Sequence, residues 1–229
     1  MKFRDRTQAG QLLAAKLEPY REEHPVILGL TRGGIPVAAE IAHVLREPLE
    51  PMVVRKLGAP ECPEYAVGAI AEGGAVFVDP DAVASVGLTE DELAAITERE
   101  ASELARRARL YLAGRALADL EDRTAIVVDD GVATGATARA AARAARQRGA
   151  ARVVLAAPVV AAASLPALRE DFDAIVAIEV PEPFAAVGAW YERFGAVEDA
   201  EVLAALDEAR RAAPAEERAT ELWDGEWIS

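Results

Sequence analysis

The chain has 229 residues, 52% of them hydrophobic, which is enough to bury one sizeable core. Its formal net charge of −14 excludes nucleic acid as a favourable partner, because like charges repel. Cys62 is the only cysteine, so neither an intrachain disulfide nor a cysteine-rich zinc site can form. Without a signal-peptide pattern or an apolar run of about 18 residues, we expect a soluble cytoplasmic protein that does not contact a membrane.

Apolar runs of strand length alternate with helical patterns along the chain, which predicts an α/β fold with a mostly parallel central sheet flanked by helices. Asp5 or Thr7 is expected to cap a first helix. The elements expected after it are a strand at 26–30, a helix at 35–45, a strand at 49–54, a loop at 55–64, β-like segments at 66–71 and 75–78, a long helix opening at the capping box 89–92, a strand ending at 128, a helix at 137–148, a strand at 152–157, a short helix near 165–170, a strand at 174–178 and a helix at 197–211.

Residues 126–137, Ile-Val-Val-Asp-Asp-Gly-Val-Ala-Thr-Gly-Ala-Thr, carry the most specific pattern in the chain. The pattern indicates a buried strand, a polar loop and a helix N-terminus. Backbone N–H groups and the hydroxyls of Thr134 and Thr137 can surround a phosphate there, helped by the positive end of the helix dipole. Asp129 and Asp130 end the strand, where sugar hydroxyls or a hydrated metal ion suit them. A ribose bearing a 5-phosphate satisfies both halves of the pattern.

Other readings of this stretch fit less well. The chain has no Gly-x4-Gly-Lys-Ser/Thr sequence, as a P-loop requires, and no Gly-x-Gly-x-x-Gly after a strand, as a dinucleotide fingerprint requires. The simpler alternative is a strand that ends in a solvated Asp-Asp turn and caps the next helix.

Two more polar segments follow predicted strands. Thr31-Arg32-Gly33-Gly34 combines a cation with paired glycines, which permit positive φ angles and a close approach of the backbone to an anion. A tight turn is the alternative interpretation. Arg55-Lys56 precedes a Gly/Pro loop, where a solvated basic turn is the alternative. Because loops after parallel strands gather at one edge of a sheet, we expect both segments near the Asp pair.

Residues 125–137 closely resemble the phosphoribosyl pyrophosphate (PRPP) motif of type I phosphoribosyltransferases. The order Arg-Gly-Gly, Arg-Lys-x-Gly-Ala-Pro and Asp-Asp-Gly-x-Ala-Thr-Gly also resembles a poorly characterised bacterial and archaeal group of this family. The resemblance implies a type I phosphoribosyltransferase-like fold, in one domain over 1–213, with a small variable hood at about 180–196. The many acidic residues near the C-terminus indicate an acidic tail at 214–229. It implies transfer of the 5-phosphoribosyl group of PRPP to a nucleobase or amine, with Mg²⁺-assisted pyrophosphate release, in nucleotide metabolism. A homodimer is expected because many relatives are dimers.

The resemblance also assigns roles to individual residues. Asp129 and Asp130 would orient the 2- and 3-hydroxyls of the ribose and hold Mg²⁺ through water. Arg32 and Lys56 would join them as catalytic residues. The expected 5-phosphate ligands are Ala133, Thr134, Gly135, Ala136 and Thr137. The expected pyrophosphate ligands are Arg32, Gly33, Gly34, Arg55 and Lys56. The expected acceptor contacts are Tyr65, Trp190 and Tyr191, although core packing is the alternative for the two hood aromatics.

Ala133 departs from one branch of the family. Enzymes acting on 6-oxopurines usually place an Asp at this position, so a hypoxanthine- or guanine-type acceptor is disfavoured. Adenine, a pyrimidine, an amine and a non-nucleobase acceptor all stay open. A second hypothesis is a PRPP- or nucleotide-sensing regulator on the same fold, and a third is a structural α/β module.

Overall fold

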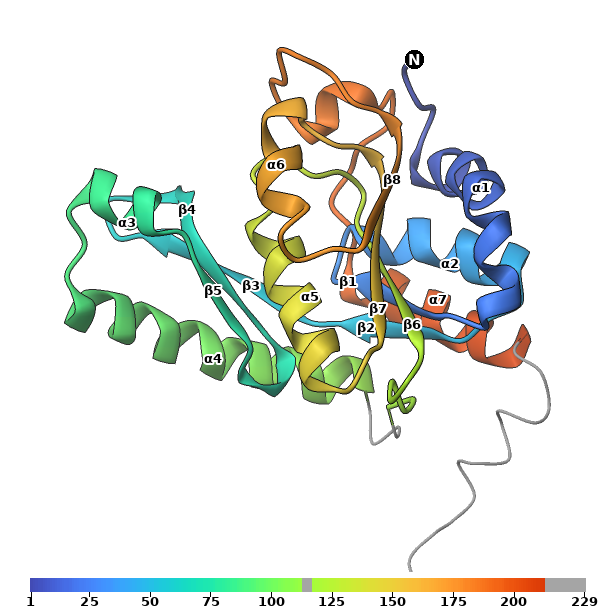
Figure 1. Ribbon diagram of the computed structural model, residues 1–229, viewed down its shortest axis with the longest axis horizontal. Coiled ribbons are helices and arrows are strands. Elements are labelled where there is room, and N and C mark those ends of the chain that lie inside the picture. The colour runs from blue at the N-terminus through green and yellow to red at the C-terminus, as the bar shows by residue number, and fades with distance from the viewer. Residues whose placement is uncertain (113–116, 213–229) are drawn as a thin grey trace, which may run out of the picture.

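The computed structural model of the chain describes residues 1–112 and 117–212 (Figure 1). Its central five-stranded sheet has the order β2-β1-β6-β7-β8 with every pairing parallel, and a second sheet has the antiparallel order β3-β4-β5. The strands are β1 Val26–Leu30, β2 Leu49–Met52, β3 Val54–Ala59, β4 Cys62–Ala71, β5 Val76–Val78, β6 Thr124–Val128, β7 Arg152–Val159 and β8 Ala174–Glu179. The helices are α1 Arg6–Leu17, α2 Gly34–Leu45, α3 Pro80–Val86, α4 Glu90–Leu112, α5 Ala136–Gln147, α6 Leu165–Leu168 and α7 Asp199–Ala212, with 3-10 turns η1 Glu18–Glu23, η2 Glu72–Gly74, η3 Ala162–Ser164 and η4 Val187–Trp190.

The predicted fold class, a mostly parallel sheet flanked by helices, is confirmed. Asp5 caps α1 by accepting a hydrogen bond from the Gln8 amide, and Thr89 and Glu92 form the reciprocal capping box that opens α4.

None of the helices in the described part of the chain is long and apolar enough to cross a membrane. The predicted acidic tail at 214–229 lies outside the described residues.

The predicted loop at 55–64 is wrong, because β3 and the start of β4 pair there as an antiparallel hairpin. Gly58 and Pro63 are residue types that are common in loops, but here Gly58 lies in β3 and Pro63 lies in β4. The register shifts on both sides of Gly58, and a Cβ added there would lie 2.3 Å from the Pro63 carbonyl oxygen. The glycine therefore allows a close approach of two strands at an irregularity. Helix α3, which Asp79 caps, was not predicted.

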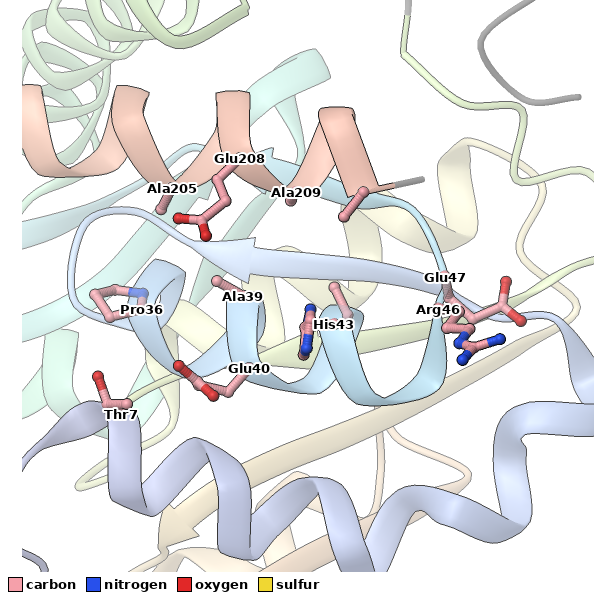
Figure 2. A pocket seen from close by; sticks show the side chains of 12 residues that line it. Thr7, Pro36, Ala39, Glu40, His43, Arg46, Glu47, Ala205, Glu208 and Ala209 are labelled. Carbon is pink, nitrogen blue, oxygen red and sulfur yellow. The ribbon is translucent and has the colours of Figure 1, made fainter. Parts of the chain in front are cut away.

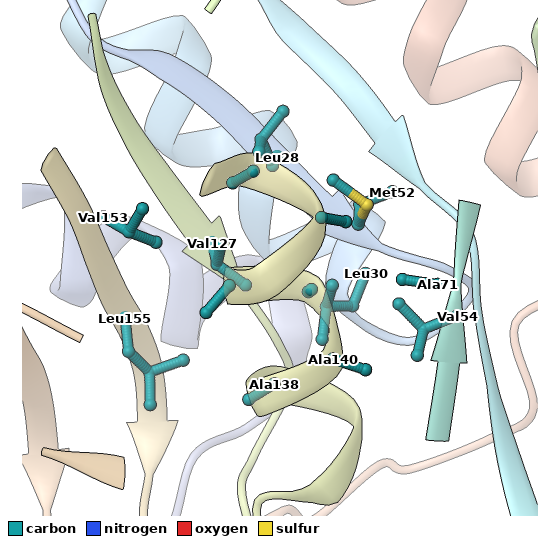
Figure 3. Packing of buried hydrophobic residues seen from close by; sticks show 14 of the residues in the cluster. Leu28, Leu30, Met52, Val54, Ala71, Val127, Ala138, Ala140, Val153 and Leu155 are labelled. Atoms are coloured by element: carbon teal, nitrogen blue, oxygen red, sulfur yellow. The ribbon is translucent and has the colours of Figure 1, made fainter. Parts of the chain in front are cut away.

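Side chains along the strands of the central sheet point alternately to its two faces, and helices cover each face. Helices α1 and α2 cover one face, where Leu13 and Ile41 pack against Ile126. Helix α5 covers the other face, where its alanines lie against Leu28, Leu30 and Val127 (Figure 3). The small alanine side chains allow a close helix–sheet approach. This packing fixes the N-terminus of α5 beside the end of β6.

The antiparallel sheet extends from the body of the molecule together with α3 and α4 (Figure 1). Leu57 and Val67 of the hairpin pack in one buried cluster with Ile96, Leu104 and Tyr111 of α4. The hairpin and α4 thus form one wall beside the carboxyl edge of the central sheet.

A buried cluster of charged residues connects the antiparallel sheet to the C-terminal end of α5. Arg148 donates to Glu50 at 2.9 Å, and its Nη1 lies 3.9 Å from Oε1 of Glu72. That Glu72 oxygen and Nη1 of Arg148 are buried without a hydrogen-bond partner. Burial raises the pKa of Glu72 to about 6.

The pKa of Glu72 predicts a pH-dependent stability. The folded chain binds this proton more tightly than the unfolded chain, whose pKa is near 4.5, so the stabilising contribution is full below that value and is lost as the pH rises through about 6. We expect Glu72→Gln to gain about 2 kcal/mol of unfolding free energy relative to wild type between about pH 4.5 and 7.5. Urea unfolding at the two pH values checks this, with the exposed Glu98→Gln as control. A pH-independent difference between Glu72→Gln and wild type would contradict the prediction.

Candidate active site

The acidic pair follows β6, between β1 and β7 at the middle of the central sheet. The Asp130 amide donates to Oδ1 of Asp129 at 2.9 Å. Burial raises the pKa of the Asp129 carboxyl well above its usual range, and the charge of Asp130 raises it further. Burial also raises the pKa of Asp130, whereas the Arg6 guanidinium opposes that rise. Two carboxylates in so little water favour the binding of hydroxyl donors and cations.

Arg6, at the start of α1, is a site residue that the sequence analysis missed. Its Nε and Nη2 both lie against Oδ2 of Asp130, at 2.8 and 2.7 Å, and its Nη1 donates to the Gly195 carbonyl at 2.9 Å. The guanidinium lies 4.0 Å from the centre of the Phe194 ring, in cation–π geometry. Arg6 is separated from Asp130 by 124 positions, and no local motif marks it.

The acidic pair, the phosphate loop and parts of both other predicted segments line one pocket of about 330 Å³, which we call the ribose pocket. Its lining residues are Leu30, Thr31, Val54, Lys56, Asp129, Asp130, Gly131, Val132, Ala133, Thr134, Gly135, Thr137, Val187 and Phe194. The carboxyl edge of the parallel sheet therefore brings Thr31, which follows β1, and Lys56 of β3, which follows β2, to the acidic pair after β6.

The loop 133–137 leads into the N-terminus of α5. Gly135 has a φ of 83°, which favours glycine, and it caps α5. The first amides of α5 have no acceptor inside the helix and carry the positive end of its dipole. The Ser164 hydroxyl donates to the Ala133 carbonyl and anchors the loop from η3. Ala136 is buried as the first residue of α5 and lies outside the pocket lining.

The two glycines after β1 serve close packing. Gly33 has a φ of −62°, and neither glycine uses the positive φ that this residue type permits. A Cβ on Gly33 would lie 2.2 Å from Oδ2 of Asp130, and a Cβ on Gly34 would lie 2.4 Å from the Val128 carbonyl oxygen. The glycines therefore let the loop after β1 lie directly against the acidic pair.

This contact predicts a stability cost for Gly34→Ala. The added methyl meets backbone atoms, which cannot rotate away, so we expect a loss of about 1–3 kcal/mol of unfolding free energy, measured by urea denaturation. Gly195→Ala is the matched control, because a Cβ there has nothing within 4 Å. Equal stabilities for the two variants would show that the loop has room to move.

The predicted cations occupy different positions. Lys56 lines the ribose pocket. Arg55 lies beside it in a neighbouring cleft and donates twice to Glu100 of α4. Arg32 does not line the ribose pocket in this structure, and its Nη1 lies 3.5 Å from Asp199 at the start of α7.

The predicted acceptor contacts are also distributed differently from expectation. Tyr191 is buried, and its hydroxyl donates to the Asp130 carbonyl at 2.6 Å, so it packs in the core behind the pocket. Neither Tyr65 nor Trp190 lines the ribose pocket, and the Tyr65 hydroxyl lies 3.2 Å from that of Ser85 instead. The hood residues that do line it are Val187 and Phe194.

A separate groove of about 480 Å³ lies between α2 and α7, and α1 borders it (Figure 2). Ala39 of α2 and Ala205 and Ala209 of α7 face it, with Glu40 and Glu208 beside them. None of the predicted site residues lines this groove. It is therefore not the candidate active site.

The acidic pair fits Mg²⁺ as a cation carried by a substrate. Mg²⁺ is usually held by one or two carboxylates together with substrate phosphates and waters. Among residues 1–112 and 117–212 no group of three or more His, Cys, Asp or Glu side chains gathers as a metal cage. Asp129 and Asp130 provide the two carboxylates, and only Oδ2 of Asp130 is engaged by Arg6.

The fold places an acidic pair and a glycine-containing loop together at the carboxyl edge of a parallel sheet flanked by helices. The family described as "Phosphoribosyl transferase domain" matches residues 6–189, and the chain belongs to that family.

Three known proteins illustrate the similarity. The chain is 43% identical over 209 residues to proteins named "Putative phosphoribosyl transferase" from two strains of Mycobacterium tuberculosis, CDC 1551 and H37Rv. The match covers 91% of this chain and 47% of each relative, so the chain spans about half the length of these relatives. The crystal structure of TT1426 from Thermus thermophilus is similar with a TM-score of 0.76 and 44% identity, over 91% of this chain and 99% of that one.

Proposed function

We propose that the protein transfers the 5-phosphoribosyl group of PRPP to a nucleobase or amine acceptor and releases pyrophosphate. The observation that supports this most strongly is the ribose pocket, where the acidic pair, the phosphate loop and Lys56 meet. A 5-phosphate fits the amides and hydroxyls of 133–137, and the ribose hydroxyls fit the carboxylates of Asp129 and Asp130.

In the reaction, the acceptor nitrogen forms a bond to C1 of the ribose while the bond from C1 to the pyrophosphate oxygen breaks. The pyrophosphate leaves with the electron pair, and the acceptor loses its N–H proton to solvent. Positive charge develops on the ribose ring, where the two carboxylates oppose it, and negative charge develops on the leaving group beside Lys56. Bound Mg²⁺, held by Asp129 and Asp130 through water, would neutralise charge on the pyrophosphate. The protein thus contributes position and electrostatics.

The acceptor side of the pocket is the hood side. Phe194 is 39% exposed and, with Val187, gives this side of the pocket an apolar surface. The phosphate loop presents Ala133, without a carboxylate, where relatives that act on 6-oxopurines usually have an Asp. The absence of a carboxylate at Ala133 supports an acceptor other than a 6-oxopurine.

The test is pyrophosphate release from PRPP and Mg²⁺ with a panel of purines, pyrimidines and small amines. We expect release with one class of acceptor by the wild type, and little release by the Asp129→Asn/Asp130→Asn double variant. Tight PRPP binding without release for any acceptor would instead support the regulator that senses PRPP. Release that is equal in the double variant would contradict the proposed site.

A further inference from the structure

The backbone of Arg32 lies beside the ribose pocket, whereas its guanidinium contacts another part of the molecule. Thr31 lines the pocket, and a Cβ added to Gly33 would lie 2.2 Å from a carboxylate oxygen of the acidic pair. Nη1 of Arg32 lies 3.5 Å from Oδ1 of Asp199 and 3.8 Å from Oε2 of Glu198, at the start of α7. Because an arginine side chain is long and has several rotatable bonds, its guanidinium can move while the backbone stays beside the pocket.

Asp199 is held in place by a buried tyrosine of a different helix. The Tyr111 hydroxyl, at the end of α4, donates to Oδ1 of Asp199 at 2.6 Å, and Tyr111 packs in one buried cluster with Val202 and Leu206 of α7. Burial, together with the hydrogen bond to Asp199, raises the pKa of Tyr111 to about 12, so the hydroxyl stays a donor. The same hydrogen bond lowers the pKa of the Asp199 carboxyl, and the charge of Arg32 lowers it further, although burial opposes them. Asp199 is therefore a fixed and charged partner for Arg32 at neutral pH.

Acidic residues at the start of a helix are ordinarily explained by the helix itself. Asp199 and Glu201 lie in the first turn of α7, where they oppose the positive end of its dipole, and the Glu201 carboxylate accepts from the Glu198 amide at 2.8 Å. The dipole does not account for the hydrogen bond from Tyr111 of α4, nor for the approach of Arg32 from the loop after β1. Three segments that are far apart in the sequence therefore meet at one atom, Oδ1 of Asp199.

We infer that the acidic start of α7 holds the Arg32 guanidinium away from the ribose pocket until a substrate with a pyrophosphate group binds. Asp199 is then a positioning residue that acts on the site through Arg32. The inference rests on the proposed function and on the pyrophosphate role that is expected of Arg32. A polyanion in the pocket competes with Asp199 and Glu198 for the guanidinium. Because the two carboxylates are 42% and 71% exposed, water screens the contact, and the substrate can break it at a small cost in affinity.

Titration calorimetry with PRPP and Mg²⁺ tests the inference on Asp199→Asn, whose side-chain oxygen can still accept from Tyr111. We expect a PRPP Kd about threefold lower than that of wild type, and a ribose 5-phosphate Kd within about 1.5-fold, because that ligand has no pyrophosphate to draw Arg32 away. Glu198→Gln, at a more exposed side chain whose folding is not at risk, is expected to lower the PRPP Kd by a smaller factor. Glu208→Gln is the matched control, because it removes the same charge from α7 at the groove between α2 and α7.

The Arg32→Gln background separates this contact from a general effect of charge. We expect Asp199→Asn to leave the PRPP Kd of Arg32→Gln unchanged within about 1.5-fold. An equal gain in that background, or an equal gain for ribose 5-phosphate, overturns the inference, because the carboxylate then acts on the ligand directly. An unchanged PRPP Kd in both Asp199→Asn and Glu198→Gln also overturns it, and leaves the proposed function intact because the wild type binds PRPP. Absence of PRPP binding by the wild type is a failure of the proposed function itself, and the inference falls with it.

Discussion

The Asp130→Asn variant is expected to release pyrophosphate at least about tenfold more slowly than the wild type, a loss of about 1.4 kcal/mol in transition-state stabilisation. The amide cannot oppose the positive charge that develops on the ribose, and it leaves the buried Arg6 guanidinium without its counter-ion. Steady-state kinetics with varied PRPP measure the effect. Because the charge matters most in the transition state, we expect a larger change in kcat than in KM.

The matched control for this variant is Asp171→Asn. Asp171 is 14% exposed and pairs with Arg139, much as Asp130 is 13% exposed and pairs with Arg6, but Asp171 lies outside the ribose pocket. We expect its turnover to stay within about twofold of wild type. Near-normal turnover in Asp130→Asn would remove Asp130 from the mechanism.

Arg6→Gln is expected to lower both the free energy of unfolding and the affinity for PRPP. Removing one partner of a largely buried ion pair leaves the other charge uncompensated, at a cost of about 3 kcal/mol. In addition, Asp130 loses the two donors that fix its carboxylate beside the pocket, and the Phe194 ring loses its cation–π contact. Urea unfolding and PRPP titration measure the two effects. Arg6→Lys is expected to recover part of the PRPP affinity, because it keeps the charge without the planar fork.

Arg139→Gln separates these two effects. Arg139 pairs with Asp171 at similar burial and lies 4.3 Å from the centre of the Phe77 ring, so it repeats the Arg6 arrangement away from the site. We expect it to lose stability while its PRPP affinity stays normal. If Arg6→Gln and Arg139→Gln bind PRPP equally well, Arg6 has only a structural role.

The parts of the site that were predicted from sequence are the parts that local residues determine. Residues 126–137 combine strand, turn and helix start in one continuous stretch, so Asp129, Gly135 and Thr137 occupy the places that the pattern indicated. The capping box at 89–92 likewise fixed the start of α4.

The rest of the site depends on contacts between distant segments. Arg6 reaches Asp130 only because α1 packs beside the central sheet, and the carbonyl of Gly195 and the ring of Phe194 complete its surroundings. Aromatic character alone could not distinguish Tyr191, whose ring stacks behind the pocket at 4.9 Å from that of Phe194, from Phe194 itself, which lines the pocket. Tertiary packing determines which aromatic residue lines the pocket, and the periodicity of the sequence does not reveal that packing.

Binding of PRPP with Mg²⁺ to the wild type and to the Asp129→Asn/Asp130→Asn double variant tests the central claim most directly. We predict one saturable site per chain by titration calorimetry for the wild type, with affinity reduced at least tenfold in the double variant. Absence of binding by the wild type, or undiminished binding by the double variant, would contradict the assignment of the ribose pocket.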